Sequence, residues 1–255
     1  MKKFKDSIAG TAVAGPHLPV VHTTSAFAFD GIAETGLLEA DDCNVYVGEK
    51  LLYFFYGRPA FRPNYGDKTT GQDQFAPVCL VMRADVAAAP RRVMPLDSGA
   101  FANRIMSDYH HPKMKKEGFE LPPDLDSTRQ VIGVYFNGSN SHYYEQDGAS
   151  PATRDKRNWY VETYVSLIDR KAANVGDGRL TAIEIQLDKD VTLAGNVLAV
   201  ALPHRLWEDP EIQALIKGWG AKELVYRIDT KFRPNEACAK IEDVVRDYLE
   251  DQGLL

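Results

Sequence analysis

The stretch LPVVHTTSAFAFDGIAETGLL, residues 18–38, predicts a strand that passes directly into a helix. The apolar residues from Leu18 to Thr23 are typical of a brief strand, and from Ser25 to Leu38 they recur near the helical period. Ser25 is a suitable N-cap and Gly36 a suitable C-terminal stop. The strand-to-helix junction presents free backbone N–H groups next to polar side chains.

Short apolar runs broken by turns follow on both sides of this unit. Alternation and apolar content predict further strands, and amphipathic spacing predicts helices. The predicted strands cover 51–55 (LLYFF), 75–83, 92–95, 180–187 (LTAIEIQL), 197–202 and 223–228. The predicted helices cover 210–217 and 235–249, the second capped by Asn235. Residues 131–136 have strand character beside a potential helix from Asp126, and 159–168 fit either state.

Composition fits one ordinary globular domain. Hydrophobic residues make up 44% and charged residues 26% of the 255 positions, and no repeat or linker is evident. We therefore expect a single α+β domain over 1–255, with the helix 235–249 packed on it. No apolar run reaches the roughly 18 residues of a membrane span, which excludes a membrane protein. The first residues lack the apolar core of a secretory signal, so we expect a cytoplasmic protein.

Charge and cysteine content limit the function further. The net charge of −6 gives no global attraction to nucleic acid, although a local basic groove is compatible with it. The three cysteines are far apart and odd in number, which fits neither a disulfide framework nor a zinc site. Their default interpretation is reduced and structural.

Three places combine polar groups with apolar strands. His22, Thr23 and Thr24 end the first strand, where their donors and acceptors suit a ribose or an amide; the alternative is that Thr24 or Ser25 only caps the helix. The carboxyl group of Glu184 lies within the alternating strand 180–187, on the same face as Gln186. An exposed face is the default for that pair, and a pocket is the alternative.

The third place is the aromatic segment YFFYGRPAFR, residues 53–62. Tyr53 and Tyr56 offer ring faces for stacking, and Arg58 offers a planar cation that pairs with phosphate. Gly57 permits close approach of a ligand to the backbone, and Pro59 fixes the exit of the chain. The alternative is that the aromatic residues belong to the core and that Arg58 lies on the surface.

The order of these segments resembles a known family. A strand with His-Thr followed by FAFDGIAETGLL, then YFFYGRPAF, and later TAIEIQLDKDVTLAGNVLAVALP, is similar to the DarT-type ADP-ribosyltransferase toxins of bacteria. The resemblance covers about the first sixty residues and some twenty-five around Glu184. After Arg58 the chain reads Pro-Ala-Phe, which departs from the longer small-residue and methionine pattern of the family.

The resemblance implies an α+β fold with a split antiparallel sheet, and NAD as the substrate. It implies that His22, with Thr23 and Thr24, contacts NAD, that Arg58 orients NAD and contributes to catalysis, and that Glu184 acts at the nicotinamide ribose and activates the acceptor. A toxin or antiviral-defence role, a nucleic-acid or protein acceptor, and a neutralising antitoxin partner are implied in the same way.

The chemistry fits these residue types. Cleavage of the nicotinamide bond develops positive charge on the ribose, which the carboxylate of Glu184 would stabilise. Tyr53 or Tyr56 would stack on the nicotinamide ring and Arg58 would offset pyrophosphate charge, so His22, Tyr56, Arg58 and Glu184 are expected to line one cleft. No metal is required.

Two other functions remain open from the sequence. The same fold could serve as a nucleotide- or protein-binding module without catalysis. A metal-dependent hydrolase around Asp108, His110 and His111 lacks the usual ligand spacing. A serine hydrolase built on Ser98 in DSGAF is not one of these two, because the segment lacks the GxSxG turn.

Overall fold

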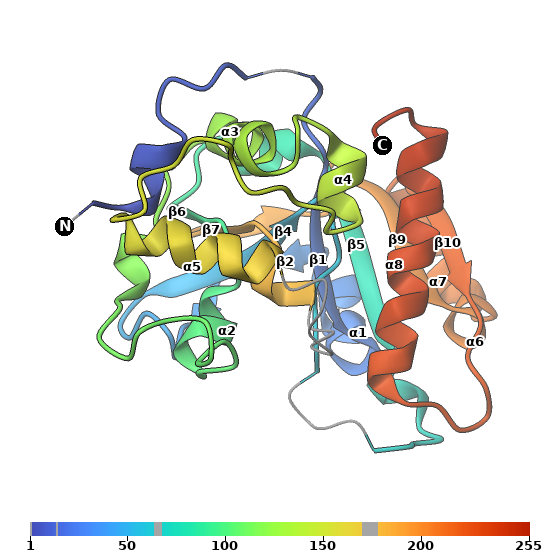
Figure 1. Ribbon diagram of the computed structural model, residues 1–255. Coiled ribbons are helices and arrows are strands. Elements are labelled where there is room, and N and C mark those ends of the chain that lie inside the picture. The colour runs from blue at the N-terminus through green and yellow to red at the C-terminus, as the bar shows by residue number, and fades with distance from the viewer. Residues whose placement is uncertain (1, 14, 64–67, 170–177) are drawn as a thin grey trace.

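A mostly antiparallel β-sheet runs through the centre of the molecule, with helices around it (Figure 1). The computed structural model describes residues 2–13, 15–63, 68–169 and 178–255. The strands are β1 (Val20–Ser25), β2 (Leu37–Leu38), β3 (Asp41–Asp42), β4 (Lys50–Tyr56), β5 (Pro77–Met82), β6 (Arg92–Met94), β7 (Glu184–Leu187), β8 (Val191–Thr192), β9 (Val197–Pro203) and β10 (Lys222–Tyr226). The helices are α1 (Ala26–Thr35), α2 (Ser98–Ala102), α3 (Asp126–Tyr135), α4 (Asn140–Tyr144), α5 (Trp159–Ile168), α6 (His204–Trp207), α7 (Pro210–Gly218) and α8 (Pro234–Asp251).

The strand order in the sheet is β10-β9-β5-β1-β4-β7-β6, with β3 paired to β4. Strands β10 and β9 are parallel, and the other neighbours along this order are antiparallel. A separate small sheet joins β2 and β8. The first predicted strand therefore lies in the middle of the sheet, between β5 and β4.

The sheet splits beside β1. This strand pairs with β5 along its whole length, from Val20↔Met82 to Ser25↔Pro77. With β4 it pairs only at Val20↔Tyr56 and Val21↔Phe55. From His22 onward β1 keeps β5 as its partner and leaves β4. The fold is thus α+β with a split antiparallel sheet and flanking helices, as the resemblance implied.

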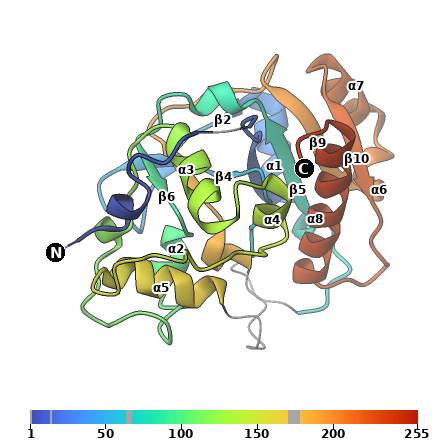
Figure 2. The same cartoon turned by 45° about the horizontal axis from the view of Figure 1, so that its top comes forward.

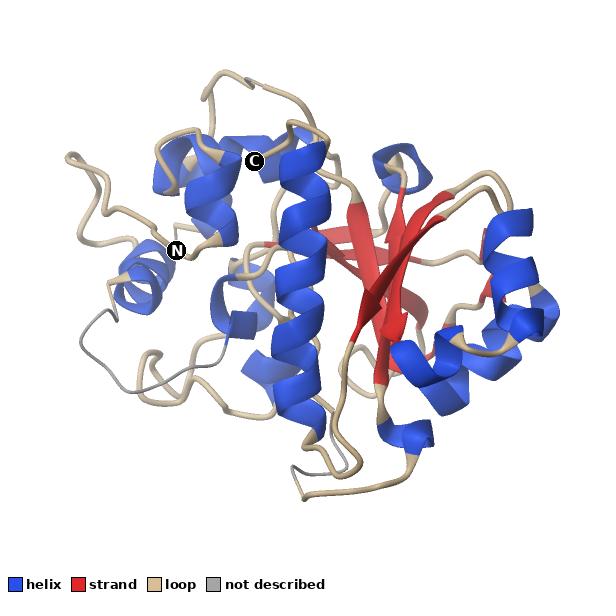
Figure 3. Cartoon of the chain, turned by 90° about the vertical axis from the view of Figure 1, so that its right-hand side faces the viewer, coloured by secondary structure: helices blue, strands red, loops and turns tan. Residues whose placement is uncertain are grey.

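Helices cover both faces of the β1-β5-β9-β10 part of the sheet. Helix α8 lies on one face, and α1, α6 and α7 lie on the other (Figure 3). Alternate residues of β5 serve the two sides, because Cys79 and Val81 pack towards α8 while Val78 and Leu80 belong to the core on the opposite side. No helix among the described residues combines the length and apolar character needed to cross a membrane.

Helices α2, α3 and α5 lie around the other end of the sheet, near β4 and β6, and α4 lies between α3 and α8 (Figure 2). A cluster of buried rings fills this side: Phe4 stacks on Tyr135 at 5.3 Å and meets Tyr164 edge-on at 4.9 Å. These contacts bring the N-terminal segment against α3 and α5. The segment between β6 and β7 thus builds a helical layer around the polar strand end at Glu184.

The structure resolves or corrects several local predictions. Residues 131–135 are helical as part of α3, with Phe136 as its C-cap, so the strand alternative there is wrong, and 159–168 form α5. Strand β7 begins only at Glu184, because a 3-10 turn occupies 178–181. Helix α8 begins at Pro234 with Arg233 as its N-cap, so Asn235 lies inside the first turn and is not the cap.

Candidate functional site

Three adjacent strands carry the candidate residues. His22 lies on β1, Arg58 follows the end of β4, and Glu184 begins β7, and these strands are neighbours in the order β1-β4-β7. The fold therefore brings these three residues, which are at least 36 positions apart in the chain, to neighbouring strands beside the split between β1 and β4. The sequence predicted three strand positions, and the structure shows that the three strands are adjacent.

His22 bridges the split with its side chain. Its Nδ1 lies 2.9 Å from the carbonyl oxygen of Tyr53, and its ring meets Phe54 edge-on at 5.9 Å. Burial lowers the pKa of His22, which keeps the imidazole neutral near pH 7. The ring is thus held where β1 leaves β4, and it offers the neutral imidazole as a hydrogen-bonding group.

His22 also lines a cleft of about 980 Å³. The walls come from α1, β2, β3 and the turn after β7, and charged side chains of both signs rim it. The lining contains the acidic residues Asp41, Asp188 and Asp190 and the basic residues Lys50 and Lys189. The described lining includes none of Tyr56, Arg58 and Glu184.

Thr23 and Thr24 extend the strand beyond His22 and pair with Cys79 and Val78. The Thr23 hydroxyl is buried next to the Cys79 thiol. Burial raises the pKa of the neighbouring Cys79 thiol to about 12, which fits the predicted inert, structural cysteine.

Tyr53 and Tyr56 differ in environment. Tyr53 is half-buried, and its hydroxyl lies 2.7 Å from the sulfur of Cys43. Tyr56 is fully buried, and its hydroxyl accepts a hydrogen bond from the backbone N–H of Leu18 at 2.9 Å. The Tyr56 ring therefore belongs to the core, which is the alternative that the sequence left open for the aromatic segment.

The local backbone explains why a glycine occupies position 57. Its φ of +67° lies in the left-handed region, and a Cβ there would stand 2.5 Å from a methyl carbon of Leu18. The close approach that glycine permits is therefore to Leu18. This tight turn directs the chain from β4 to Arg58.

Arg58 is almost fully buried, with 1% of its surface exposed, so the surface alternative for this residue is wrong. Its Nη2 donates to the carbonyl of Gly178 at 2.8 Å and to the hydroxyl of Thr181 at 3.3 Å. The guanidinium carbon lies 5.5 Å from the ring centre of Tyr143. Its Nε and Nη1 find no hydrogen-bond partner within the described part of the chain.

The carboxyl group of Glu184 is enclosed, with 2% of the residue exposed. Ser98 donates to it twice, from its hydroxyl at 2.7 Å and from its backbone N–H at 3.0 Å. The amide nitrogen of Gln186 donates to the same carboxyl at 2.5 Å. The default of an exposed Glu184 and Gln186 face is therefore wrong, because α2 and the turn before it cover this side of β7.

Electrostatics at Glu184 favour the protonated form. Burial raises the pKa of Glu184 to about 8, and the nearby carboxylate of Asp97 adds to the rise. The hydrogen bonds from Gln186 and Ser98 act in the opposite direction but are outweighed. Such a carboxyl exchanges a proton close to neutral pH, which suits acid–base work.

The pairing of strands separates His22 from Glu184. Glu184 lies opposite Phe55, which lies opposite Val21, so these three share one face of the sheet. His22 follows Val21 and contacts Phe54, so its side chain lies on the other face. The described lining of the His22 cleft contains none of the other three residues, so the expectation that His22, Tyr56, Arg58 and Glu184 line one cleft stays a prediction.

Arg58 and Glu184 nevertheless lie at the same end of the β4–β7 pair. The backbone N–H of Tyr56 donates to the carbonyl of Ile183 at 2.9 Å, two residues before Arg58 and one before Glu184. Arg58 also holds Thr181, three residues ahead of Glu184. The buried cation thus anchors the segment that leads into the carboxyl-bearing strand.

The sequence singled out Glu184 but missed the group that surrounds it. Ser98 was considered only as a hydrolase nucleophile, and Arg92 was not considered at all. Arg92 Nη1 donates to the Gln186 side-chain oxygen at 2.6 Å. The shared face of Glu184 and Gln186 was the available signal, because a polar pair in an apolar strand needs partners when it is buried.

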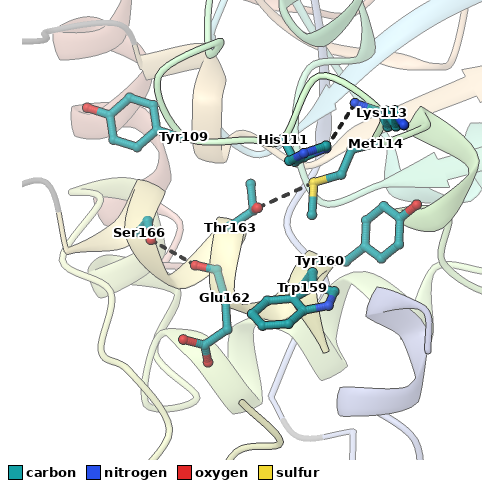
Figure 4. A pocket seen from close by; sticks show the side chains of 9 residues that line it. All are labelled: Tyr109, His111, Lys113, Met114, Trp159, Tyr160, Glu162, Thr163 and Ser166. Atoms are coloured by element: carbon teal, nitrogen blue, oxygen red, sulfur yellow. Dashed lines mark hydrogen bonds between the residues drawn. The ribbon is translucent and has the colours of Figure 1, made fainter. Parts of the chain in front are cut away.

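A second cavity, of about 560 Å³, lies between the 109–114 loop and α5 (Figure 4). Trp159 is 57% exposed on its rim, and the Thr163 hydroxyl lies 3.5 Å from the sulfur of Met114. The ring of His110, considered above as a metal ligand, packs on Phe101 at 4.6 Å. The described residues contain no group of three or more side chains suited to hold a metal ion.

Comparison with protein-family models and with curated proteins gives no match. Among solved structures, the chain is similar to one titled "Thermus sp. 2.9 DarT in complex with NAD+". The TM-score is 0.44 at 12% sequence identity, and the alignment covers 84% of this chain and 98% of that one. A likeness at this level is too low to transfer a ligand or an activity between the two proteins.

Proposed function

We propose that this protein is an NAD-dependent mono-ADP-ribosyltransferase that modifies a macromolecular acceptor. The observation that carries the proposal is the buried Glu184 carboxyl at the same strand end as the buried Arg58 guanidinium, next to a split in the sheet that His22 bridges. The motif resemblance around these three residues supports the same activity.

Arg58 supports the use of an anionic substrate. Two of its nitrogens, Nε and Nη1, are buried without partners among the described residues. A buried guanidinium with unused donors is costly unless a group of opposite charge meets it. A phosphate or a ribose hydroxyl of NAD would supply acceptors there, and we propose Arg58 as the residue that orients NAD.

Glu184 supports the transfer step. In that step the bond between the nicotinamide nitrogen and ribose C1′ breaks, and the electron pair leaves with nicotinamide. The acceptor forms a new bond to C1′ and gives up its proton. The Glu184 carboxylate stabilises the positive charge on the ribose and takes that proton.

His22, with Thr23 and Thr24, is proposed to contact NAD, and Tyr53 is proposed to lie beside the nicotinamide ring. His22 is neutral and held by the Tyr53 carbonyl, so its second ring nitrogen is left to bond a ligand in the adjoining cleft. Tyr56 is fully buried, so we propose that it supports this site from the core.

The decisive test is incubation of the purified protein with NAD labelled in the adenylate part, together with a cell lysate. We expect nicotinamide release and label in the nucleic-acid or the protein fraction, and loss of both in Glu184→Gln and in Arg58→Met. Absence of nicotinamide release with the unmodified protein would overturn the proposal and favour a binding module, which NAD binding by calorimetry would then detect.

The cellular role follows from the same resemblance. We propose a toxin or defence effector that acts in the cytoplasm and has a neutralising antitoxin partner. Expression in a bacterial host should arrest growth, and Glu184→Gln should abolish the arrest. Normal growth with the active protein would contradict the toxin role and leave the transfer activity to its own assay.

A further inference from the structure

We propose that Arg92 and Gln186 are positioning residues for Glu184: Arg92 fixes the orientation of the Gln186 amide so that Gln186 always presents a donor to the Glu184 carboxyl. This inference deepens the proposed function and rests on it for the catalytic role of Glu184. We call this chain of contacts, from Arg92 through Gln186 to Glu184, the relay; it lies in the β6–β7 region.

The orientation of the Gln186 amide follows from its two neighbours. On one side Arg92 Nη1 lies 2.6 Å from the side-chain oxygen. On the other side the amide nitrogen lies 2.5 Å from Glu184 Oε1 and 3.3 Å from the Ser98 hydroxyl. A guanidinium has only donors, so the atom facing Arg92 must be the oxygen and the NH₂ group must face Glu184.

Arg92 is itself held in place. Its Nη2 pairs with Glu49 at 3.1 Å and its Nε with Glu120 at 3.2 Å. Its guanidinium carbon lies 3.8 Å above the ring of Tyr46, which limits its movement further. A cation fixed on three sides cannot turn away from Gln186 without breaking several contacts.

The register of the strands supports the relay. Arg92 pairs with Gln186, and Met94 with Glu184, across the antiparallel β6–β7 ladder. Arg92, Gln186 and Glu184 therefore share one face, and the relay runs from the partly exposed Glu49 to the enclosed carboxyl. Gln186 has no exposed surface, so the protein supplies its partners there.

Other groups also face Glu184 and set its charge state. Asp97 stands at the N-cap of α2, and the hydroxyls of Tyr46 and Tyr53 lie near the carboxyl. Removal of the donor from Gln186 keeps these groups in place but also takes away the hydrogen bond between Gln186 and Tyr46. It takes away one of the bonds that favour the charged carboxylate, so the pKa of Glu184 should rise.

The test compares Arg92→Met with Arg91→Met in the full chain. Both arginines pair with Glu49, but the Arg91 side chain is half-exposed, and among the described residues its polar contact is with Glu49 alone. The readout is the ¹³C carboxyl titration of Glu184, assigned by comparison with Glu184→Gln. We expect its midpoint to rise by about one pH unit in Arg92→Met and to stay unchanged in Arg91→Met.

A double-mutant cycle separates the relay from the bare charge of Arg92. Gln186→Met keeps the volume and the Arg92 charge but removes the donor, and it should raise the midpoint by a similar amount. If Arg92 acts through Gln186, Arg92→Met adds nothing in the Gln186→Met background. Additive shifts would show that Arg92 acts by its field and would overturn the inference.

Activity provides the second readout. The rising limb of the pH profile of nicotinamide release should move upward with the titration midpoint, with kcat at pH 7 lowered about tenfold and KM for NAD unchanged. Arg92→Lys, which keeps a donor for the Gln186 oxygen, should restore most of the lost activity.

Two outcomes separate the relay from the proposed function. If neither the unmodified protein nor any variant cleaves NAD while the titration shifts as expected, the proposed function fails and the relay stands. If Arg92→Met leaves the titration unchanged, the relay fails whatever the activity.

Discussion

At the scale of the residue, three donors converge on the Glu184 carboxyl, and yet its pKa is raised. The backbone N–H and hydroxyl of Ser98 and the amide of Gln186 each favour the charged form. Burial and the carboxylate of Asp97 disfavour it more strongly. The protein thus keeps this group close to the point where it changes charge, and the surrounding donors limit how far its pKa can rise.

This balance makes a prediction for stability. The folded-state pKa of Glu184, about 8, lies above the ordinary value of 4.5. Between those values the folded protein binds more protons than the unfolded chain, so the free energy of unfolding must fall as pH rises. Relative to Glu184→Gln, the unmodified protein should lose stability from pH 5 to pH 8 by on the order of a few kcal/mol. Urea unfolding at several pH values measures the difference.

The control is Glu223→Gln, because Glu223 is exposed on β10, at the opposite edge of the sheet. Its difference from the unmodified protein should be nearly constant over the same pH range. The raised pKa would be contradicted if the difference in free energy of unfolding between the unmodified protein and Glu184→Gln did not change with pH. It would also be contradicted if the unmodified protein gained stability relative to Glu184→Gln as pH rises.

At the scale of the element, α1 links the strand with His22 to the cleft beside it. The Ser25 side chain accepts a hydrogen bond from the backbone N–H of Ala28 at 3.3 Å, and Gly36 ends the helix with a φ of +66°. Four α1 residues line the His22 cleft: Ala28, Gly31, Ile32 and Thr35. The cap therefore fixes both the start of the helix and one wall of the cleft.

Loss of this cap should weaken the helix. Ser25→Ala removes the acceptor and should lower the free energy of unfolding by about 1 kcal/mol. Ser25→Asp keeps an acceptor at the N-cap and should cost much less. Thermal and urea unfolding compare the two variants, and equal losses would show that the contact to Ala28 does not stabilise the helix.

The sequence could predict elements whose signal is local. The helical spacing and caps of α1, the apolar runs of β5 and β9, and the long amphipathic α8 are found where the pattern placed them. The secondary structure of 131–136 stayed ambiguous because a short apolar segment fits a strand or a buried helix equally well. The helix forms there in part because the Asp124 side chain accepts a hydrogen bond from the backbone N–H of Ser127 at 2.7 Å, in the first turn upstream of the apolar run.

The candidate site was only partly predictable for a related reason. Alternation in 180–187 places Glu184 and Gln186 on one face, but it cannot say what covers that face. The cover is Ser98 at the start of α2, 86 positions away in the chain, and Arg92 on β6. Contacts over such separations depend on the order of strands in the sheet, which no local pattern contains.

At the scale of the whole molecule, two hydrophobic clusters share the same strands. Val78 and Leu80 of β5 belong to the larger cluster, and Cys79 and Val81 belong to the cluster under α8. Strand β9 divides its residues in the same way. Neither cluster can lose its strands without exposing the other, which supports one domain over the described chain.

We therefore predict a single cooperative unfolding transition, even for a variant that weakens only the α8 side. Ile241 is fully buried on the inner face of α8, and Ile241→Ala should lower the free energy of unfolding by about 2–4 kcal/mol. Far-UV circular dichroism reports on all helices, whereas tryptophan fluorescence reports on Trp159 in α5 and on Trp207 and Trp219 beside α7. The two signals should shift together to lower denaturant, while Asp243→Ala, on the exposed side of the same helix, should leave both in place. If Ile241→Ala instead separates the two signals into distinct transitions, α8 and the strands beneath it unfold on their own and the chain is not one cooperative domain.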